Sequence, residues 1–487
     1  MTSTDASVRE FSFIKGVENV VAPKDGNIFQ WNTAAARVRE HLHDALNAKN
    51  LAFLFGSGCS SVVSGIEQKG IPTMGPLAAE FLKPFSTSSQ QPPGNPAPAI
   101  VLGLPPLPGS APLPPVPVPV PLPPGTTLPT NPAPTPPDNE LTLPTAHERT
   151  VLIDALGFDI ASPEFSNNLE RLMEALYSFQ FVLKRSTSAA LIPAAGIVES
   201  LIKKVTKFVT ARCSTGSFAT GDDTLVRLYQ SFYRKLAYRD RTLPRPWVFT
   251  TNYDLFSETA MDRLGMPYCN GFSGTVERRF NPTTYRYALA EQLDLTSRKW
   301  AAVDSFIYLC KLHGSINWVE EGGSLFPIRE VTVDQAQGAD RVMIYPTPMK
   351  QNASFGSPYS DLFREFQARV VKEQTVLIVV GYSFGDEHVN NIIFQALTIP
   401  SFRLVALLPP DAAGIPKKLR ELNDPRIWFI GGDGPDDNDS RAHYFDTFVE
   451  KFMPEAPEDK VDTAVERVLR ELIAQGKAPD AGELDSL

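Results

Sequence analysis

Residues 51–61, L-A-F-L-F-G-S-G-C-S-S, constrain the fold of this chain more than any other stretch. The first five are all apolar, which is typical of a strand buried on both faces of a parallel sheet. The run ends in Gly56-Ser57-Gly58, where glycine permits a sharp turn and the close approach of a ligand. If a helix follows, its free N–H groups and its dipole favour a bound phosphate. We therefore expect the start of a nucleotide-binding fold, with an ordinary tight turn as the alternative.

The glycine spacing excludes two common phosphate-binding motifs. A dehydrogenase fingerprint, G-x-G-x-x-G, needs a third glycine at the position of Ser61, and a phosphate loop needs G-K-[ST]. If the loop binds a nucleotide, it therefore does so in a protein of a different class.

The composition is that of a globular protein. The chain has 487 residues, of which 43% are hydrophobic and 21% charged, enough for one large domain or two smaller ones. A net charge of −9 argues against a nucleic-acid-binding protein. Four cysteines without a C-x-x-C pair provide no zinc ribbon and suit a reducing cytoplasm. No signal-peptide core or apolar run of about 20 residues occurs, so we expect neither export nor a membrane span.

The pattern of strands and helices predicts an α/β fold. Short apolar runs predict strands at residues 51–55, 247–250, 307–312, 342–345, 376–380, 404–408 and 427–430. Helical spacing predicts helices at residues 33–49, 168–184, 194–212, 223–238, 361–372, 388–397 and 417–422. Alternating strands and helices indicate a Rossmann-like, doubly wound parallel sheet.

We predict three regions along the chain. An N-terminal arm and helix (residues 1–50) precede the nucleotide-binding domain (51–450), and a C-terminal helix and tail (451–487) follow. The domain carries a proline-rich insertion (91–144) and a helical insertion module (150–245). In the C-terminal helix, Val461, Val465, Val468, Leu469 and Leu472 share one face. This face packs on its own domain or joins subunits into a homo-oligomer.

Polar residues follow three of the predicted strands: Asn252 and Asp254, then His313, then Gly381 and Ser383. The carboxyl ends of parallel strands meet at one crevice, where such sheets bind ligands. Structural alternatives exist for each. Asn252 or Asp254 can cap a helix, a single histidine is often structural, and we expect Asp386 to cap its helix rather than to take part in chemistry. Gly432-Asp433 is expected to form a plain turn.

These motifs, in this order, resemble those of the sirtuin family. G-S-G-C-S (56–60), followed by G-I-P (70–72), resembles the family's G-A-G-I-S and G-I-P; T-T-N-Y-D (250–254) resembles T-Q-N-I-D; L-H-G (312–314) and G-Y-S (381–383) resemble L-H-G and G-T-S. The longer G-Y-S-F-x-D-x-H form is similar to that of bacterial sirtuin-like defence proteins. The missing zinc ribbon and the altered residues beside Asn252 depart from the protein-deacylating members.

The resemblance implies that NAD+ is the substrate and that no metal is needed. Asn252 would order the nicotinamide ribose and a water, His313 would be the general base, and Asp254 would contact the nicotinamide. Gly56, Ser57, Gly58 and Ser60 would hold the pyrophosphate, and Gly381 and Ser383 the adenosine half.

The function implied is a cytoplasmic NAD+ hydrolase (NADase) that depletes NAD+ in antiphage defence, by abortive infection. Activation by self-assembly or by a partner is expected, with a HerA-type ATPase as the first partner to test. An NAD-dependent protein deacylase and a non-catalytic module that senses NAD or ADP-ribose are the alternatives.

We predict that the proline-rich insertion is dispensable for NAD+ turnover. Of the chain's 44 prolines, 21 lie between Pro92 and Pro144, and such a segment forms neither helix nor sheet. Extended chain is expected there, or a polyproline ligand for a partner domain. Replacement of residues 92–137 by a short linker should leave the melting temperature and ligand turnover nearly unchanged. A large drop in either would show that the segment packs on the domain.

Overall fold

The computed structural model describes residues 11–23, 29–64, 67–85, 143–215, 221–294, 299–303, 305–321, 327–337, 342–344, 357–435 and 440–455. Apart from its last two residues, the proline-rich insertion predicted at 91–144 lies outside these ranges. The C-terminal face with Val461 and Leu472 lies outside them as well.

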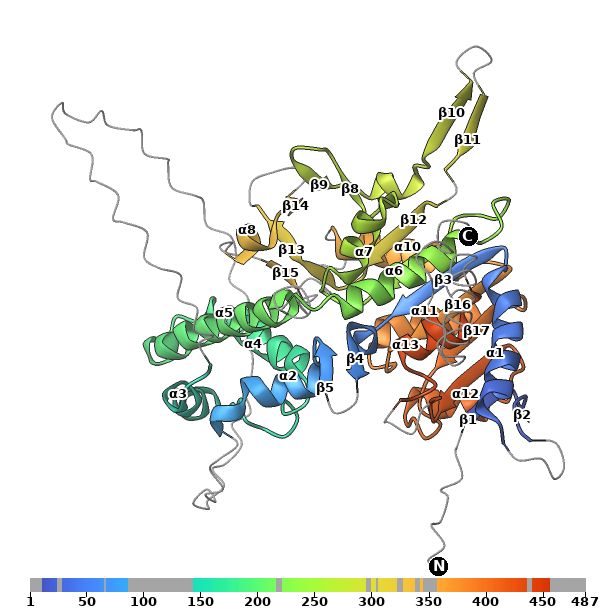
Figure 1. Cartoon of the computed structure of the whole chain (residues 1–487). Helices are drawn as coiled ribbons and strands as arrows, with labels where there is room; N and C mark the ends of the chain where they lie inside the picture. The colour runs from blue at the N-terminus through green and yellow to red at the C-terminus, as the bar shows by residue number, and fades with distance from the viewer. Residues whose placement is uncertain are drawn as a thin grey trace, which may run out of the picture.

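A nine-stranded sheet forms the centre of the protein, with the order β2-β1-β18-β17-β16-β3-β6-β12-β7 (Figure 1). Its strands are β1 (Phe11–Lys15), β2 (Glu18–Asn19), β3 (Asn50–Phe55), β6 (Trp247–Thr250), β7 (Tyr268–Cys269), β12 (Ile307–Lys311), β16 (Thr375–Val380), β17 (Arg403–Leu407) and β18 (Ile427–Gly432). Neighbouring strands from β18 to β7 run parallel. The predicted doubly wound parallel sheet is confirmed.

The order of the strands reverses between β3 and β16. From β3 the chain proceeds to β6 and β12 on one side, and it then returns to β16, β17 and β18 on the other. Apart from the short β7, this is the order 3-2-1-4-5-6 of a dinucleotide-binding sheet. The connections that leave β3 and β16 diverge there, so a crevice opens at their carboxyl ends.

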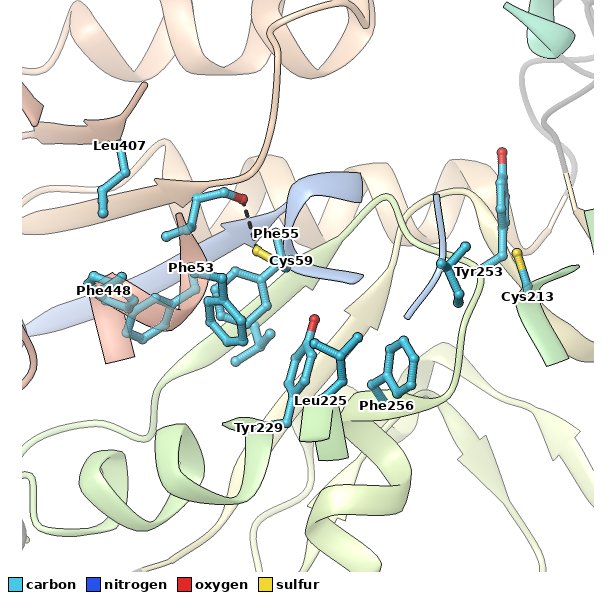
Figure 2. Packing of buried hydrophobic residues seen from close by; sticks show 14 of the residues in the cluster. Phe53, Phe55, Cys59, Cys213, Leu225, Tyr229, Tyr253, Phe256, Leu407 and Phe448 are labelled. Carbon is cyan, nitrogen blue, oxygen red and sulfur yellow. Dashed lines mark hydrogen bonds between the residues drawn. The ribbon is translucent and has the colours of Figure 1, made fainter. Parts of the chain in front are cut away.

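Both faces of the sheet are covered, because the residues of β3 alternate between two cores. Phe53 and Phe55 belong to one core, and Ala52 and Leu54 to the other. The first core includes α1 (Trp31–Leu46), α6 (Thr224–Ala237), α7 (Phe256–Leu264), α13 (Phe445–Thr447) and the π-helix η5 (Phe448–Phe452). The second includes α10 (Tyr359–Val370), α11 (Glu387–Leu397) and α12 (Ile415–Glu421). Figure 2 shows Phe53 and Phe55 among Tyr229 of α6 and Phe448 of η5.

A group of helices extends to one side of the sheet (Figure 1). It consists of α2 (Met74–Phe81), α3 (Ala146–Leu156), α4 (Leu169–Leu183) and α5 (Ile192–Thr215), with α4 packed on α5. Thr145 and Glu148 form a capping box at the start of α3, and Asn168 caps α4. The helices predicted at 168–184 and 194–212 are confirmed. No helix in the described ranges is both long enough and apolar enough to cross a membrane.

A second, antiparallel sheet was not predicted from the sequence. Its order is β15-β13-β14-β9-β8, formed by β8 (Phe272–Ser273), β9 (Arg278–Phe280), β13 (Gly314–Glu320), β14 (Ile328–Glu330) and β15 (Val342–Ile344). The strand predicted at 342–345 therefore belongs to this sheet, not to the parallel one. Nearby are the hairpin of β10 (Ala290–Asp294) with β11 (Lys299–Ala302) and the short helix α8 (Val333–Gln337).

Part of the N-terminal arm also forms strands. β1 pairs antiparallel with β18, from Phe11 opposite Gly432 to Lys15 opposite Trp428. The sequence shows no clear period here, so we predicted only an arm and named no strand in it. Phe13 is fully buried and packs edge-on against Trp428, with ring centroids 5.5 Å apart. The arm is therefore an integral edge of the sheet.

We predict that Phe53→Ala destabilises the protein by about 3–5 kcal/mol. Phe53 is fully buried, and its ring lies 5.1 Å from that of Phe232, so truncation leaves a cavity between β3 and α6. Urea unfolding followed by circular dichroism measures the change. Phe181→Ala is the control, because Phe181 is 36% exposed; an equal effect of both changes would contradict the prediction.

Candidate functional site

The glycine turn after β3 is followed by a 3-10 turn, not by an α-helix. The turn η1 (Ser57–Ser60) leads into a hairpin of β4 (Ser61–Ser64) and β5 (Glu67–Gly70), and α2 begins only at Met74. The phosphate site that a helix at this position would provide is therefore not formed. The turn instead contacts the connection after β16, where Gly58 N donates to Gly381 O at 3.0 Å.

A close backbone contact explains why glycines occupy the connections after β3 and after β16. A Cβ atom at Gly56 would lie 2.4 Å from Gly381 O, and one at Gly58 would lie 2.8 Å from Gly381 Cα. Gly381 itself has φ +65°, a conformation that L side chains rarely adopt. Behind the contact, Cys59 Sγ donates to Val380 O at 3.2 Å (Figure 2). These glycines let the two connections pack together at the point where the strand order reverses.

A cleft of about 900 Å³ lies over this point. Of the residues predicted for the site, its lining contains Ser57, Ser60, Asn252, Asp254, His313, Gly381 and Ser383. Gly56 and Gly58 lie behind them, in the contact between the two connections. Another part of the lining comes from the helices α2, α4 and α5, including Met74, Glu170, Met173 and Val209. The structure thus brings residues from 57 to 383 around one cavity of the size that nucleotides occupy.

The turn after β6 is joined to the glycine turn by a chain of hydrogen bonds. Asn252 Nδ2 donates to Gly56 O and to Ser60 Oγ, both at 2.9 Å. Ser60 Oγ donates to Asp254 Oδ2 at 2.5 Å, and Asp254 Oδ1 accepts from Phe256 N at 3.0 Å. Asp254 thus holds an N–H at the start of α7, as the cap interpretation expects. Both amide hydrogens of Asn252 are used, and its Oδ1 is the atom left for a ligand in the cleft.

A buried lysine holds the same turn from below. Lys311 Nζ lies 3.0 Å from Glu258 Oε1, and it donates to Ser315 Oγ at 2.8 Å and to the backbone oxygens of Tyr253 and Asp254. Lys311 is 1% exposed and Glu258 6% exposed. Burial raises the pKa of Glu258, although Lys311 counteracts it. The ion pair fixes the backbone that carries Asn252 and Asp254.

His313 ends β12 and lies between two carboxylates. Its Nε2 donates to Asp386 Oδ2 at 2.8 Å, and its Nδ1 lies 3.9 Å from Glu170 Oε1. Burial lowers the pKa of His313, but the hydrogen bond to Asp386 and the charge of Glu170 outweigh this effect, so the pKa is raised. Since Nε2 carries the hydrogen, Nδ1 is the ring nitrogen that can accept a proton.

Asp386 has two roles in this arrangement. Its Oδ1 accepts from His388 N at 2.7 Å and Val389 N at 3.1 Å, so it caps α11 as expected. Its Oδ2 holds His313, which the sequence analysis did not anticipate. Tyr382 Oη accepts from Asp386 N at 3.2 Å and thereby fixes the same turn. The carboxylate is therefore held rigidly against the imidazole.

Sequence reasoning missed three charged residues at this site. Lys311 had a usable signal, because it is the one charged residue in an otherwise apolar strand. The spacing of Glu258 was also a usable signal: it stands four positions after Asp254, so that both residues lie on the same side of the start of a helix. Glu170 had no signal, because a glutamate in the first turn of a helix usually serves the helix dipole.

The arrangement can bind a nucleotide at the turns, with His313 placed to act on it as a general base. The described residues contain no group of three or more His, Cys, Asp and Glu side chains placed to share a metal ion. None of the four cysteines forms a disulfide.

Comparison with known families gives one match. Residues 246–430 match the family model of the SIR2-like domain. The match runs from the start of β6 into β18 and includes Asn252, Asp254, His313, Gly381 and Ser383. The glycine turn after β3 and the helices α2 to α5 lie outside it. A search of curated proteins finds no match.

We predict that Asp386→Asn lowers the pKa of His313. Asparagine keeps the helix cap but removes the negative charge, so burial then dominates. NMR titration of the histidine ring signals measures the shift, with the exposed His147 as an internal reference. An unchanged pKa of His313 would show that the Asp386 carboxylate contributes little to that pKa.

The same pair also determines how stability varies with pH. Because the folded-state pKa of His313 is raised, its stabilising contribution is complete below about pH 6.5 and is lost as the pH rises through the raised value. The wild type should therefore exceed Asp386→Asn in free energy of unfolding at low pH, and this difference should become smaller as the pH rises into the alkaline range.

Proposed function

The chain carries a SIR2-like domain at residues 246–430, and we propose that it hydrolyses NAD+ at the bond between nicotinamide and ribose. The observation that carries the proposal is the placement of His313. Its Nε2 is held by Asp386 at 2.8 Å, and the ring lines a cleft at the carboxyl ends of β3 and β16. A general base must be fixed and must face the substrate; the hydrogen bond to Asp386 and the place of His313 in the lining of the cleft support this role.

The proposed binding mode follows the division of the cleft. The pyrophosphate would lie over the turn with Ser57 and Ser60, which line the cleft after the carboxyl end of β3. The adenosine half would contact Gly381 and Ser383. Nicotinamide and its ribose would then lie against Asn252 and His313, with Asp254 near the nicotinamide amide.

The proposed reaction is a displacement by water. The C1′–N bond breaks, its electron pair leaves with nicotinamide, and a water oxygen forms the new bond to C1′. Asn252 Oδ1 would accept a hydrogen bond from this water or from the ribose. His313 Nδ1 would take the proton, so that NAD+ and water give ADP-ribose, nicotinamide and one proton.

We place this activity in antiphage defence, in the cytoplasm, where NAD+ depletion stops phage growth together with the host cell. The support is the G-Y-S-F-x-D-x-H sequence at the turn with Asp386, which resembles that of bacterial sirtuin-like defence proteins. A hydrolase of NAD+ must be silent until infection. We therefore propose activation by assembly into a homo-oligomer or by a partner, first of all a HerA-type ATPase.

One experiment separates the proposed activity from protein deacylation and from ligand sensing. The purified chain is incubated with NAD+, with and without an acetylated peptide, and the same assay is made on lysates of infected cells. Mass spectrometry should detect ADP-ribose and nicotinamide regardless of the peptide. O-acetyl-ADP-ribose formed only with the peptide would indicate a deacylase. Binding of NAD+ without products in either preparation would indicate a sensing module.

We predict that His313→Ala and Asn252→Ala each reduce NAD+ cleavage by on the order of 10²- to 10⁴-fold. Binding of NAD+ should fall far less, because the affinity rests mainly on contacts to the phosphates and the adenosine half. Release of nicotinamide and isothermal titration with NAD+ measure the two effects. His147→Ala is the control for loss of a histidine. Cleavage at the wild-type rate by His313→Ala would make His313 structural.

A further inference from the structure

Glu170 is an acidic residue of the helical module that lies close to His313. It is the second residue of α4, and its backbone is fixed because Asn168 Oδ1 accepts from Glu170 N at 2.9 Å. Its Oε1 accepts from Tyr253 Oη at 2.9 Å and lies 3.9 Å from His313 Nδ1. The side chain is 42% exposed and lines the cleft. A carboxylate thus faces the ring nitrogen on which the proposed chemistry depends.

We propose that Glu170 is a catalytic residue of NAD+ cleavage, which contacts the nicotinamide ribose and stabilises the positive charge that develops on it. This inference rests on the proposed function. It goes beyond the matched family region, because Glu170 lies outside residues 246–430.

The geometry supports a direct contact with the ribose. Nε2 of His313 is occupied by Asp386, so a ribose hydroxyl or a water must approach Nδ1. Because Nδ1 and Glu170 Oε1 are 3.9 Å apart, a hydroxyl bound to Nδ1 can reach the same carboxylate. The hydrogen bond from Tyr253 occupies one lone pair of Oε1 and holds the carboxylate in place.

The chemistry requires such a group. When the C1′–N bond breaks, the electron pair leaves with nicotinamide, and the ribose gains the character of an oxocarbenium ion. Glycosidases stabilise such a transition state with a carboxylate beside the sugar ring. The negative charge of Glu170 would do so here, in a cleft partly screened from water. The attacking water gives its proton to His313 Nδ1, and Glu170 takes no part in this proton transfer.

Two parts of the fold would then contribute side chains to the ribose site. Asn252 and His313 follow strands of the parallel sheet, and Glu170 comes from α4, beside His313. The site would be complete only when α4 lies against the turn with Tyr253. The helical module would thus be part of the active site and not an appendage.

The test compares Glu170→Gln with Glu199→Gln, which removes the same charge from an exposed position of α5, where the side chain is 53% exposed. Glutamine preserves the shape of Glu170 and can still accept from Tyr253. We expect kcat for NAD+ cleavage to fall on the order of 10²-fold in Glu170→Gln, with little change in KM. Glu199→Gln should match the wild type. Melting temperatures confirm that both variants fold.

A second measurement distinguishes a catalytic from a structural role. Added formate should restore part of the NAD+ cleavage that Glu170→Ala loses, because formate can occupy the vacated space and supply a carboxylate. Rescue is not expected for His313→Ala under the same conditions.

The outcomes are separable from those of the proposed function. If the wild type cleaves NAD+ and Glu170→Gln does so equally fast, Glu170 is not catalytic and the proposed function stands. An equal loss in Glu170→Gln and Glu199→Gln would also overturn this role, because the effect would then be one of net charge. If the wild type cleaves no NAD+, either as the purified chain or in lysates of infected cells, the proposed function fails and this inference fails with it.

Discussion

The contact between two glycine-containing turns is the constraint on which the site depends. β3 and β16 are neighbours in the sheet, and their connections leave in opposite directions. Gly58 and Gly381 allow the backbones of these connections to touch, and Gly58 N lies 3.0 Å from Gly381 O. Any side chain at these positions would separate the turns. Since Ser60 lies on one turn and Ser383 on the other, the width of the cleft depends on this contact.

The polar groups of the site are positioned by charges beneath the surface. Lys311 and Glu258 form an ion pair of low exposure, and such a pair is costly unless its hydrogen-bonding groups are satisfied. Lys311 meets the requirement for its own ammonium group by donating to the backbone of the turn after β6, whereas Glu258 Oε2 has no hydrogen-bond partner among the described residues. The energy of burying the pair is thereby coupled to the shape of the turn. Asp386 acts similarly on His313 while also capping α11.

The sequence predicted the central sheet well, because its strands are apolar on both faces and need no partner to be recognised. The lining residues that the sequence did predict were found because each lies in a turn after such a strand. The second sheet was missed because strands as short as Phe272–Ser273 carry no periodicity. The pairing of His313 with Asp386, 73 positions apart, and the contact of Glu170 with His313 depend on tertiary packing. Local patterns do not contain that information.

The position of β3 at the middle of the sheet has a consequence for synthesis on the ribosome. Phe55 pairs with Val380, so the strand emerges more than 300 residues before one of its two neighbours. Its other neighbour, β6, begins at Trp247. Through most of translation an apolar strand with an unpaired edge is therefore exposed, and such edges aggregate. A nascent chain of this topology is a natural client of chaperones that shield hydrophobic segments.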